Sequence, residues 1–127
     1  MKNDPDANKR NAIDFYRTAY LGDPTQAVAR YVGADYIQHN PMVAEGKQAF
    51  IDYFTEMAKD YPGKTIEFVR AVAEGDLVAL HTHQTWPGGD EYVTMDFFRF
   101  DADGKIVEHW DAIQLVPPET KSGNSMY

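Results

Sequence analysis

The feature that most constrains this fold is a change in the spacing of apolar residues near position 64 of the 127. Beyond it, apolar and polar residues alternate along four runs, which is typical of β-strands. Short turns rich in Gly, Asp and Pro separate the runs, and turns of this length join neighbouring antiparallel strands. The sequence therefore predicts a long antiparallel meander with strands at residues 65–74, 77–86, 92–100 and 105–116.

The first half of the chain has the spacing of amphipathic helices. Asp23 followed by Pro24 is typical of a helix start, and Pro62-Gly63 marks an end. Three helices are predicted, at residues 7–21, 24 to about 32 and 46–61. A short extended segment is predicted at residues 35–40, before Pro41. Helices gathered before a meander must cover one of its faces, so we expect an α+β architecture with a curved sheet.

Amino-acid composition disfavours several kinds of binding partner. A formal charge of −8 disfavours a nucleic-acid or anionic-membrane surface, which needs clustered Lys and Arg. With no Cys, thiolate catalysis and Cys-ligated zinc are excluded, and we found no signal peptide or membrane-length apolar run. We expect one cytoplasmic domain over residues 1–127, with loose ends at 1–6 and 117–127, that binds a small molecule.

The hairpin TMDFFRFDADGKIVEHWDAIQ at residues 94–114 carries the most distinctive polar groups. Asp96 lies in an otherwise apolar strand, and the next strand carries His109, Trp110 and Asp111. Burial in an apolar wall disfavours the charged form of a carboxyl group and makes it a proton donor or a tunable base. A structural carboxylate there would need a partner, and none is adjacent in sequence.

Strand alternation leaves open which polar groups meet. His81 and His83 share one face of their strand, opposite the face with Val78 and Leu80. A bulge would reverse the assignment. If both histidines point at the helices together with Asp96 and Asp111, the four meet in a cavity; otherwise the histidines are half-exposed, and Asp111 pairs with Arg99 or caps a turn. For His39 and Asn40, just before Pro41, an alternative interpretation is that they only form a turn.

Other kinds of site find less support. His81 and His83 with one Asp resemble a set of metal ligands, but no helical zinc motif or calcium-type spacing accompanies them, so we predict no metal and no cofactor. Both Ser residues, Ser122 and Ser125, lie in the tail, which argues against nucleophilic catalysis. General acid–base chemistry on a mostly apolar small molecule remains.

Three segments together resemble the SnoaL-like polyketide cyclases of the nuclear transport factor 2-like superfamily: YIQHNP at 36–41, EGKQAFIDYF at 45–54 and DFFRFDADGKIVEHWDAIQ at 96–114. The resemblance covers nearly the whole chain. It implies a cone of curved antiparallel sheet, with about four long strands and a short one, closed by three N-terminal helices over a deep pocket. It also implies a homodimer formed through the outer face of the sheet.

The resemblance assigns roles to individual residues. Asp96 matches the acid/base aspartate of the cyclases, and His83, with His81 as a second candidate, is similar to their pocket residues on the preceding strand. Asn40, or His39 in a register shifted by one, falls where ketosteroid isomerase carries its base. Asp111 is similar to an aspartate of the limonene epoxide hydrolases, whose arginine is replaced here by Thr94, so epoxide hydrolysis by that arrangement is not expected.

We therefore weigh three hypotheses. The first is a cofactor-free cyclase, isomerase or lyase in which His39 or His83 removes a carbon-bound proton and Asp96 donates to the enolate. The second is a domain that binds an apolar metabolite without chemistry, and the third is a scaffold whose pocket is filled. The predicted ligand contacts are Tyr36, Asn40, His81, Phe98, His109, Trp110 and Asp111. The predicted dimer surface consists of Val78, Leu80, Trp86, Val93, Met95 and Phe97.

Overall fold

The computed structural model describes residues 3–127 and contains three helices and five strands. The helices precede the four long strands, as predicted, and the short strand lies between the second and third helices. In chain order the elements are α1 (Pro5–Tyr20), α2 (Pro24–Tyr31), β1 (Val32–Gln38), α3 (Lys47–Asp60), β2 (Thr65–Glu74), β3 (Leu77–Thr85), β4 (Glu91–Phe100) and β5 (Ile106–Leu115).

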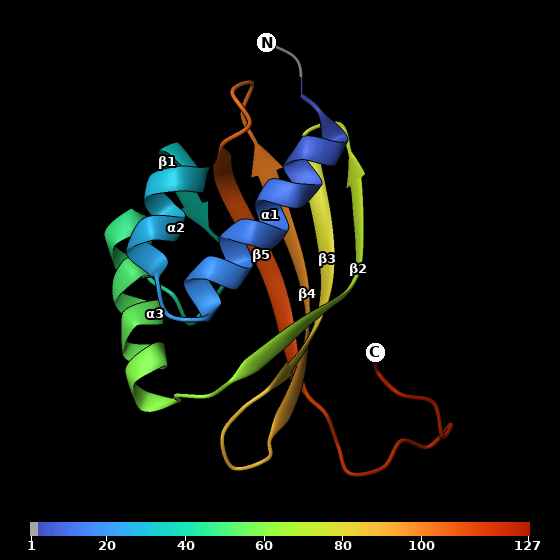
Figure 1. Ribbon diagram of the computed structural model, residues 1–127. Coiled ribbons are helices and arrows are strands. Elements are labelled where there is room, and N and C mark those ends of the chain that lie inside the picture. Colours follow the sequence, from blue (N-terminus) through green and yellow to red (C-terminus); the bar gives the residue numbers. More distant parts are fainter. Residues whose placement is uncertain (1–2) are drawn as a thin grey trace.

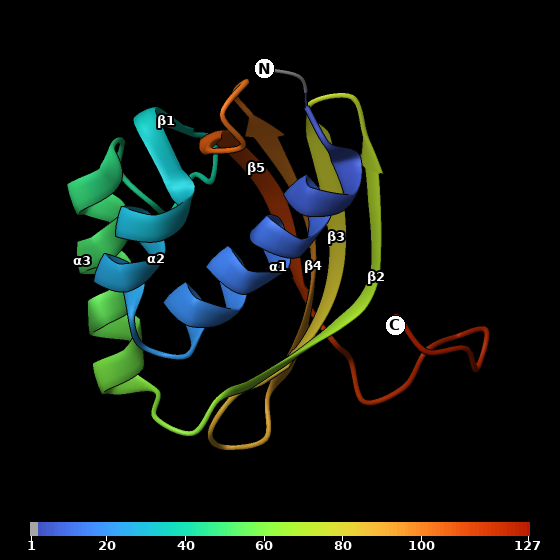
Figure 2. The same cartoon turned by 45° about the horizontal axis from the view of Figure 1, so that its top comes forward.

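The five strands form one sheet in the order β1-β5-β4-β3-β2. β2 to β5 pair as an antiparallel meander, and β1 joins the edge of β5 in parallel. The sheet curves around α1, and all three helices lie on its concave side (Figures 1 and 2). The predicted α+β architecture, a curved sheet packed on three helices, is thus confirmed.

Side-chain caps set the start of the first two helices. Asp4 accepts hydrogen bonds from the backbone N–H groups of Asp6 and Ala7, so α1 begins at Pro5, inside the segment that we expected to be loose. At α2 the predicted cap forms: Asp23 Oδ1 accepts from the Gln26 N–H at 3.1 Å. Both helices carry Pro in their first turn, where its missing N–H costs nothing.

β1 starts directly at the end of α2, three residues before the predicted extended segment. It can lie close to β5 because residue 33 is Gly: a Cβ atom at Gly33 would be 3.0 Å from the Val107 Cγ1 atom. The Gln38 end of β1 pairs with His109, and the His39 N–H donates to the His109 carbonyl at 2.9 Å. β1 therefore brings the segment 38–40 beside β5.

An aromatic core fills the space between the helices and the sheet. Phe15 of α1 stacks on Phe50 of α3 at 5.2 Å and meets the edge of Phe98 from β4 at 5.9 Å. Val78 and Leu80 of β3 are fully buried in this core. Their placement on the outer dimer surface was wrong, because the even-numbered residues of β3 face the helices and the odd-numbered ones face away.

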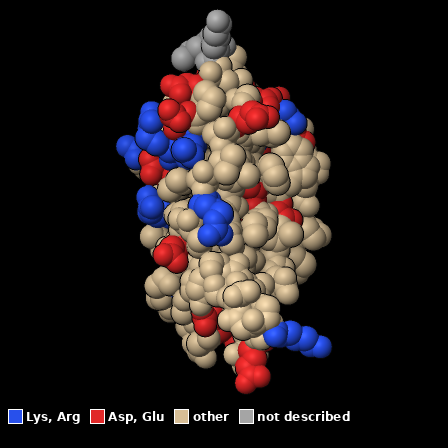
Figure 3. Space-filling model, turned by 90° about the vertical axis from the view of Figure 1, so that its right-hand side faces the viewer, with Lys and Arg blue, Asp and Glu red and all other residues tan. Residues whose placement is uncertain are grey.

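Residues 117–127 have no helix or strand, as expected, but their end is not loose. The Tyr127 ring stacks on His83 with 3.6 Å between ring centres, and the Met126 carbonyl lies 3.0 Å from the Nε2 atom of His81. The tail thus returns to the outer face of the sheet. On the side of the molecule that Figure 3 shows, acidic and basic side chains are interspersed among broad areas of uncharged residues. Across residues 3–127, no helix has the length and apolarity needed to cross a membrane.

Candidate acid–base site

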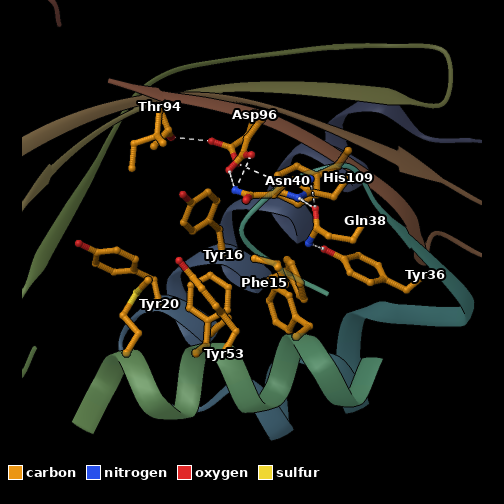
Figure 4. A pocket seen from close by; sticks show the side chains of 18 of the residues that line it. Phe15, Tyr16, Tyr20, Tyr36, Gln38, Asn40, Tyr53, Thr94, Asp96 and His109 are labelled. Carbon is orange, nitrogen blue, oxygen red and sulfur yellow. Dashed lines mark hydrogen bonds and ion pairs between the residues drawn. The ribbon is translucent and has the colours of Figure 1, made fainter. Parts of the chain in front are cut away.

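A pocket lies between the concave face of the sheet, α1 and α3 (Figure 4). It contains a cavity of about 60 Å³, which is several times the space that one water molecule needs. Polar side chains from the sheet and from segment 38–40 form one wall, and aromatic and apolar side chains of α1 and α3 form the other. The lining residues are Phe15, Tyr16, Ala19, Tyr20, Tyr36, Gln38, Asn40, Val43, Phe50, Tyr53, Phe54, Met57, Gln84, Thr94, Asp96, Phe98, His109, Asp111 and Ile113.

Asp96 lies at the centre of the polar wall and is 1% exposed. Its Oδ1 atom accepts a hydrogen bond from the Thr94 hydroxyl at 2.5 Å, and its Oδ2 atom lies 2.8 Å from the Nε2 atom of His109. Asp96 and Thr94 share a face of β4 because they are two residues apart. The carboxyl group thus has the partner that its burial requires, and this partner comes from β5.

Gln38 determines which ring nitrogen of His109 carries a fixed proton. The Asn40 backbone N–H donates to Gln38 Oε1 at 3.0 Å, which identifies that atom as the amide oxygen. The same oxygen lies 2.8 Å from His109 Nδ1, and the Gln38 amide nitrogen donates to the Tyr36 hydroxyl at 3.0 Å. Because an amide oxygen only accepts, Nδ1 must carry a hydrogen.

The assignment at Nδ1 has a consequence at the other ring nitrogen. A bare Nε2 lone pair beside a charged carboxylate would be repulsive at 2.8 Å, so one proton lies between Nε2 and Asp96 Oδ2. The pair is then either imidazolium with carboxylate or imidazole with carboxylic acid. Both forms have zero net charge and hold one transferable proton inside an apolar site.

A second set of hydrogen bonds orients the Thr94 hydroxyl. Trp86 Nε1 donates to Gln84 Oε1 at 3.3 Å, and the Gln84 amide nitrogen donates to the Thr82 hydroxyl at 3.3 Å. Thr82 and Thr94 hydroxyl oxygens are 2.5 Å apart, so Thr82 donates to Thr94 and Thr94 donates to Asp96. This direction makes Asp96 Oδ1 an acceptor, so the shared proton lies at the other oxygen, between Oδ2 and His109 Nε2.

Gln84 also positions a tyrosine hydroxyl in the pocket. Its amide nitrogen donates to the Tyr16 oxygen at 2.9 Å, which leaves the Tyr16 hydroxyl hydrogen available to a ligand. Burial, followed by the charge of Asp96, raises the pKa of Tyr16 well above its ordinary value of 10.0. Burial likewise raises the pKa of Tyr36. Both hydroxyls therefore stay protonated at neutral pH, and each accepts a hydrogen bond from a glutamine amide.

Asp111 is the second carboxyl group of the pocket and lies beside Asp96 across the β4–β5 pair. The Asn40 side-chain nitrogen donates to both of its oxygens, at 2.7 and 2.9 Å. Burial, and then the charge of Asp96, raises the pKa of Asp111 from its ordinary value, against lowering contributions from His109 and Asn40. A raised pKa makes this carboxylate a stronger base.

Four predicted site residues do not line the pocket. His81 and His83 lie on the outer face of the sheet: the His83 Nε2 atom is 2.6 Å from Glu91, and the His81 ring contacts the tail and Arg70. The physical reason is the parity of β3, whose buried face carries Val78, Leu80, Thr82 and Gln84.

His39 and Trp110 also point away from the pocket. Their rings stack with 4.9 Å between centres, and the His39 Nε2 atom lies 2.7 Å from a Glu108 oxygen. Gln38 and Asn40 line the pocket, whereas His39 between them does not. Five predicted ligand contacts do line it: Tyr36, Asn40, Phe98, His109 and Asp111.

Gln38, Tyr16 and Gln84 line the pocket but were not predicted as site residues. Gln38 is two residues from Asn40, so strand alternation would have placed the two on one face. Tyr16 lies on the apolar side of α1, and that side lines the pocket.

Among residues 3–127, one group of side chains has ligand atoms close enough for a metal ion: Asp96, His109 and Asp111, within 4.8 Å of one another. Gln38 would orient His109 for such an ion as a second-layer hydrogen bond does in metal sites. The ion would have to replace the shared proton, so metal binding and acid catalysis exclude each other here.

Comparison with known proteins places this geometry in context. The family model of the SnoaL-like domain matches residues 12–109. No curated protein sequence matches the chain. Similar solved structures include TsrD from Streptomyces laurentii, at 19% identity over 89% of this chain and 92% of the other with a TM-score of 0.76. A proposed polyketide cyclase from Bacillus cereus has 18% identity over 85% and 74% of the two chains, with a TM-score of 0.75.

An M. tuberculosis epoxide hydrolase that resembles limonene epoxide hydrolases is also similar, at 17% identity over 87% of this chain and 84% of the other, with a TM-score of 0.69. At these identities the structural similarity shows a shared fold, and the chemistry must be argued from the pocket.

Proposed function

Because this chain belongs to the SnoaL-like domain family, we propose that it is a cofactor-free enzyme that carries out general acid–base chemistry on a small, largely apolar carbonyl compound. The reaction is an aldol-type cyclisation or an isomerisation. The observation that carries the proposal is the buried Asp96–His109 pair, with 2.8 Å between Oδ2 and Nε2, in an otherwise largely aromatic pocket.

The role of each group follows from whether it holds a proton or can accept one. Asp111, oriented by Asn40, takes a proton from the carbon next to the substrate carbonyl, and the Asp96–His109 pair gives its shared proton to the carbonyl oxygen. Asp111 becomes neutral while the pair becomes negative, so the total charge of the pocket is unchanged. The Tyr16 hydroxyl adds a hydrogen bond to the developing oxyanion, and one such donor contributes on the order of 3–4 kcal/mol.

This assignment replaces the base suggested by sequence. His39 and His83 were the candidates, and both lie outside the pocket. Asp111 takes the role because it lines the cavity, has a raised pKa, and has hydrogen-bond capacity left beyond Asn40. Asp96 keeps its proposed part as a proton donor, now together with His109.

The proposal is tested by proton exchange, which requires no knowledge of the natural substrate. 4-Methylcyclohexanone is a compact ketone with exchangeable hydrogens beside its carbonyl, and their replacement by deuterium in D₂O is followed by NMR. We expect the protein to accelerate exchange, Asp96→Asn to reduce it at least about 100-fold, and EDTA to leave it unchanged. The matched control is Asp35→Asn, the same substitution at an exposed position of β1.

A different result would support the alternative, a domain that binds small molecules without chemistry. That result is binding of the ketone, seen as shifts in protein NMR signals, with an exchange rate no greater than that of buffer. Exchange that is unaffected by Asp96→Asn would also contradict the proposed roles. Far-ultraviolet circular dichroism of each variant shows whether it is folded.

We also propose a homodimer formed through the outer face of the sheet. Two aromatic or apolar side chains of β4, Met95 and Phe97, are about half exposed there, at 50% and 48%, and Val72 of β2 is 64% exposed. Apolar groups that cluster on one face favour burial against a partner. Val78, Leu80, Val93 and Trp86 drop out of the surface proposed from sequence, since the first three are buried and Trp86 packs on Tyr61 and Tyr92.

A further inference from the structure

The charge of the pocket, taken with its aromatic walls, points to a ligand class. Of the described residues that line the pocket, none is Lys or Arg, whereas two are Asp and one is His. The Asp96–His109 pair is neutral because it holds one shared proton. The charge of Asp111 therefore has the amide of Asn40 as its hydrogen-bond partner, and no Lys or Arg of the lining neutralises it.

The side chains around Asp111 are suited to a positive charge. Tyr16, Tyr36 and Tyr53 line the same pocket as Asp111. Aromatic faces attract cations through the negative potential of the ring, most strongly where water is excluded. A carboxylate beside several rings is therefore a site for a compact ammonium group.

One ammonium group of the protein already uses a ring at this end of the molecule. The Lys64 Nζ atom lies 4.7 Å from the centre of the Tyr20 ring, and Lys64 does not line the pocket. Its burial lowers its pKa. The contact shows that the ring of Tyr20, a residue of the pocket wall, accepts a cation. Lys64 itself does not line the pocket.

We propose that the pocket prefers carbonyl compounds that carry a protonated nitrogen, attracted by the charge of Asp111 and by the surrounding tyrosine rings, and that it rejects compounds with a carboxylate or phosphate. That the ligand is a carbonyl compound rests on the proposed function. The preference for a positive charge concerns binding alone. The net charge of −8 acts in the same direction, since it repels anions from the molecule as a whole.

Three ketones of nearly equal size separate charge from shape. They are 1-methyl-4-piperidone, which is cationic near neutral pH, 4-methylcyclohexanone, which is neutral, and 4-oxocyclohexanecarboxylate, which is anionic. Dissociation constants are measured by NMR titration of the protein at fixed ionic strength. We expect the cation to bind about tenfold more tightly than the neutral ketone, and the anion to bind more weakly than both.

The variant Asp111→Asn removes the charge and keeps the shape of the side chain. We expect it to bring the cationic and neutral ketones to within about twofold of each other, while Asp35→Asn preserves the difference. Equal binding of the three ketones to the unmodified protein would overturn the inference, and so would a preference that survives Asp111→Asn. Neither result would touch the proposed function, which is decided separately by the exchange of 4-methylcyclohexanone and its loss in Asp96→Asn.

Discussion

Asp111 combines a cost to stability with a proposed catalytic role. Its pKa is raised in the folded protein, chiefly by burial, so the folded state holds its proton more tightly than the unfolded state. Because the native state binds more protons over this range, stability falls as pH rises from the ordinary pKa of about 3.9 through the raised value. The charge of Asp111 therefore opposes folding at neutral pH.

We expect Asp111→Asn to raise the melting temperature at pH 7, since the buried charge is removed and the Asn40 amide still finds an oxygen. The gain should shrink as pH falls through the raised pKa of Asp111, because the native carboxyl group is protonated below it. Thermal unfolding of both proteins between pH 4 and 8 checks this. A variant that is less stable than the parent at pH 7 would show that the Asn40–Asp111 hydrogen bonds outweigh the cost of burying the charge.

Thr94 supports Asp96 from within the core. It is 1% exposed, donates to Asp96 and accepts from Thr82, so Thr94→Val removes a donor and an acceptor without changing the size of the side chain. We expect the free energy of unfolding in urea to fall by about 1–3 kcal/mol, because two buried polar groups each lose a partner. Thr65→Val, the same change at an exposed strand position, should alter it by less than about 0.5 kcal/mol.

Some residues of this site could be predicted from the sequence, and others could not. Asp96 was recognisable because a lone carboxyl group in an apolar strand requires a partner. Its partner His109 was predicted as a ligand contact, but their pairing depends on the alignment of β4 with β5, which no local pattern specifies. His81 and His83 were predicted to line the pocket because of their chemistry and the family resemblance. Both lie on the outer face, because the odd-numbered residues of β3 point away from the helices.

β1 has more influence on the pocket than its length suggests. This seven-residue strand delivers Gln38, which sets the tautomer of His109, and is followed by Asn40, which orients Asp111. Its parallel pairing with β5 joins segments about 70 residues apart, so local spacing could not reveal it. The meander was predictable by contrast, because its strands are linked by short turns and each turn has a recognisable composition.

Gly33 is the position where β1 is most sensitive to change. A Cβ atom there would lie 3.0 Å from both Val107 Cγ1 and Asp101 Oδ2. We expect Gly33→Ala to lower the free energy of unfolding by about 1–3 kcal/mol through overpacking, and to shift the NMR signals of His109 as β1 moves away from β5. The exposed neighbour provides the control, Ala34→Ser, which should change neither. A variant with full stability and unchanged His109 signals would mean that β1 does not fix the pocket.

The proposed dimer is a property of the complete fold, because residues of several strands form the outer face. Phe97→Glu places a charge at the half-exposed centre of this face, where burial against a partner would be costly. We expect the unmodified protein to elute with twice the 14.4 kDa mass of one chain in light-scattering chromatography, and the variant with the mass of one. A parent protein that is monomeric at every concentration tested would contradict the proposed interface.

The chemistry proposed for this molecule depends on one proton, between Asp96 and His109. Nitrogen-15 NMR of the histidine rings observes it directly, with the His109 signals assigned by their loss in a His109→Gln variant. We predict that Nδ1 of His109 is protonated through its bond to Gln38, that a second proton lies between Nε2 and Asp96, and that Asp96→Asn perturbs Nε2 while Nδ1 keeps its hydrogen. An unprotonated Nδ1 in the unmodified protein would contradict the shared-proton pair and the acid catalysis built on it.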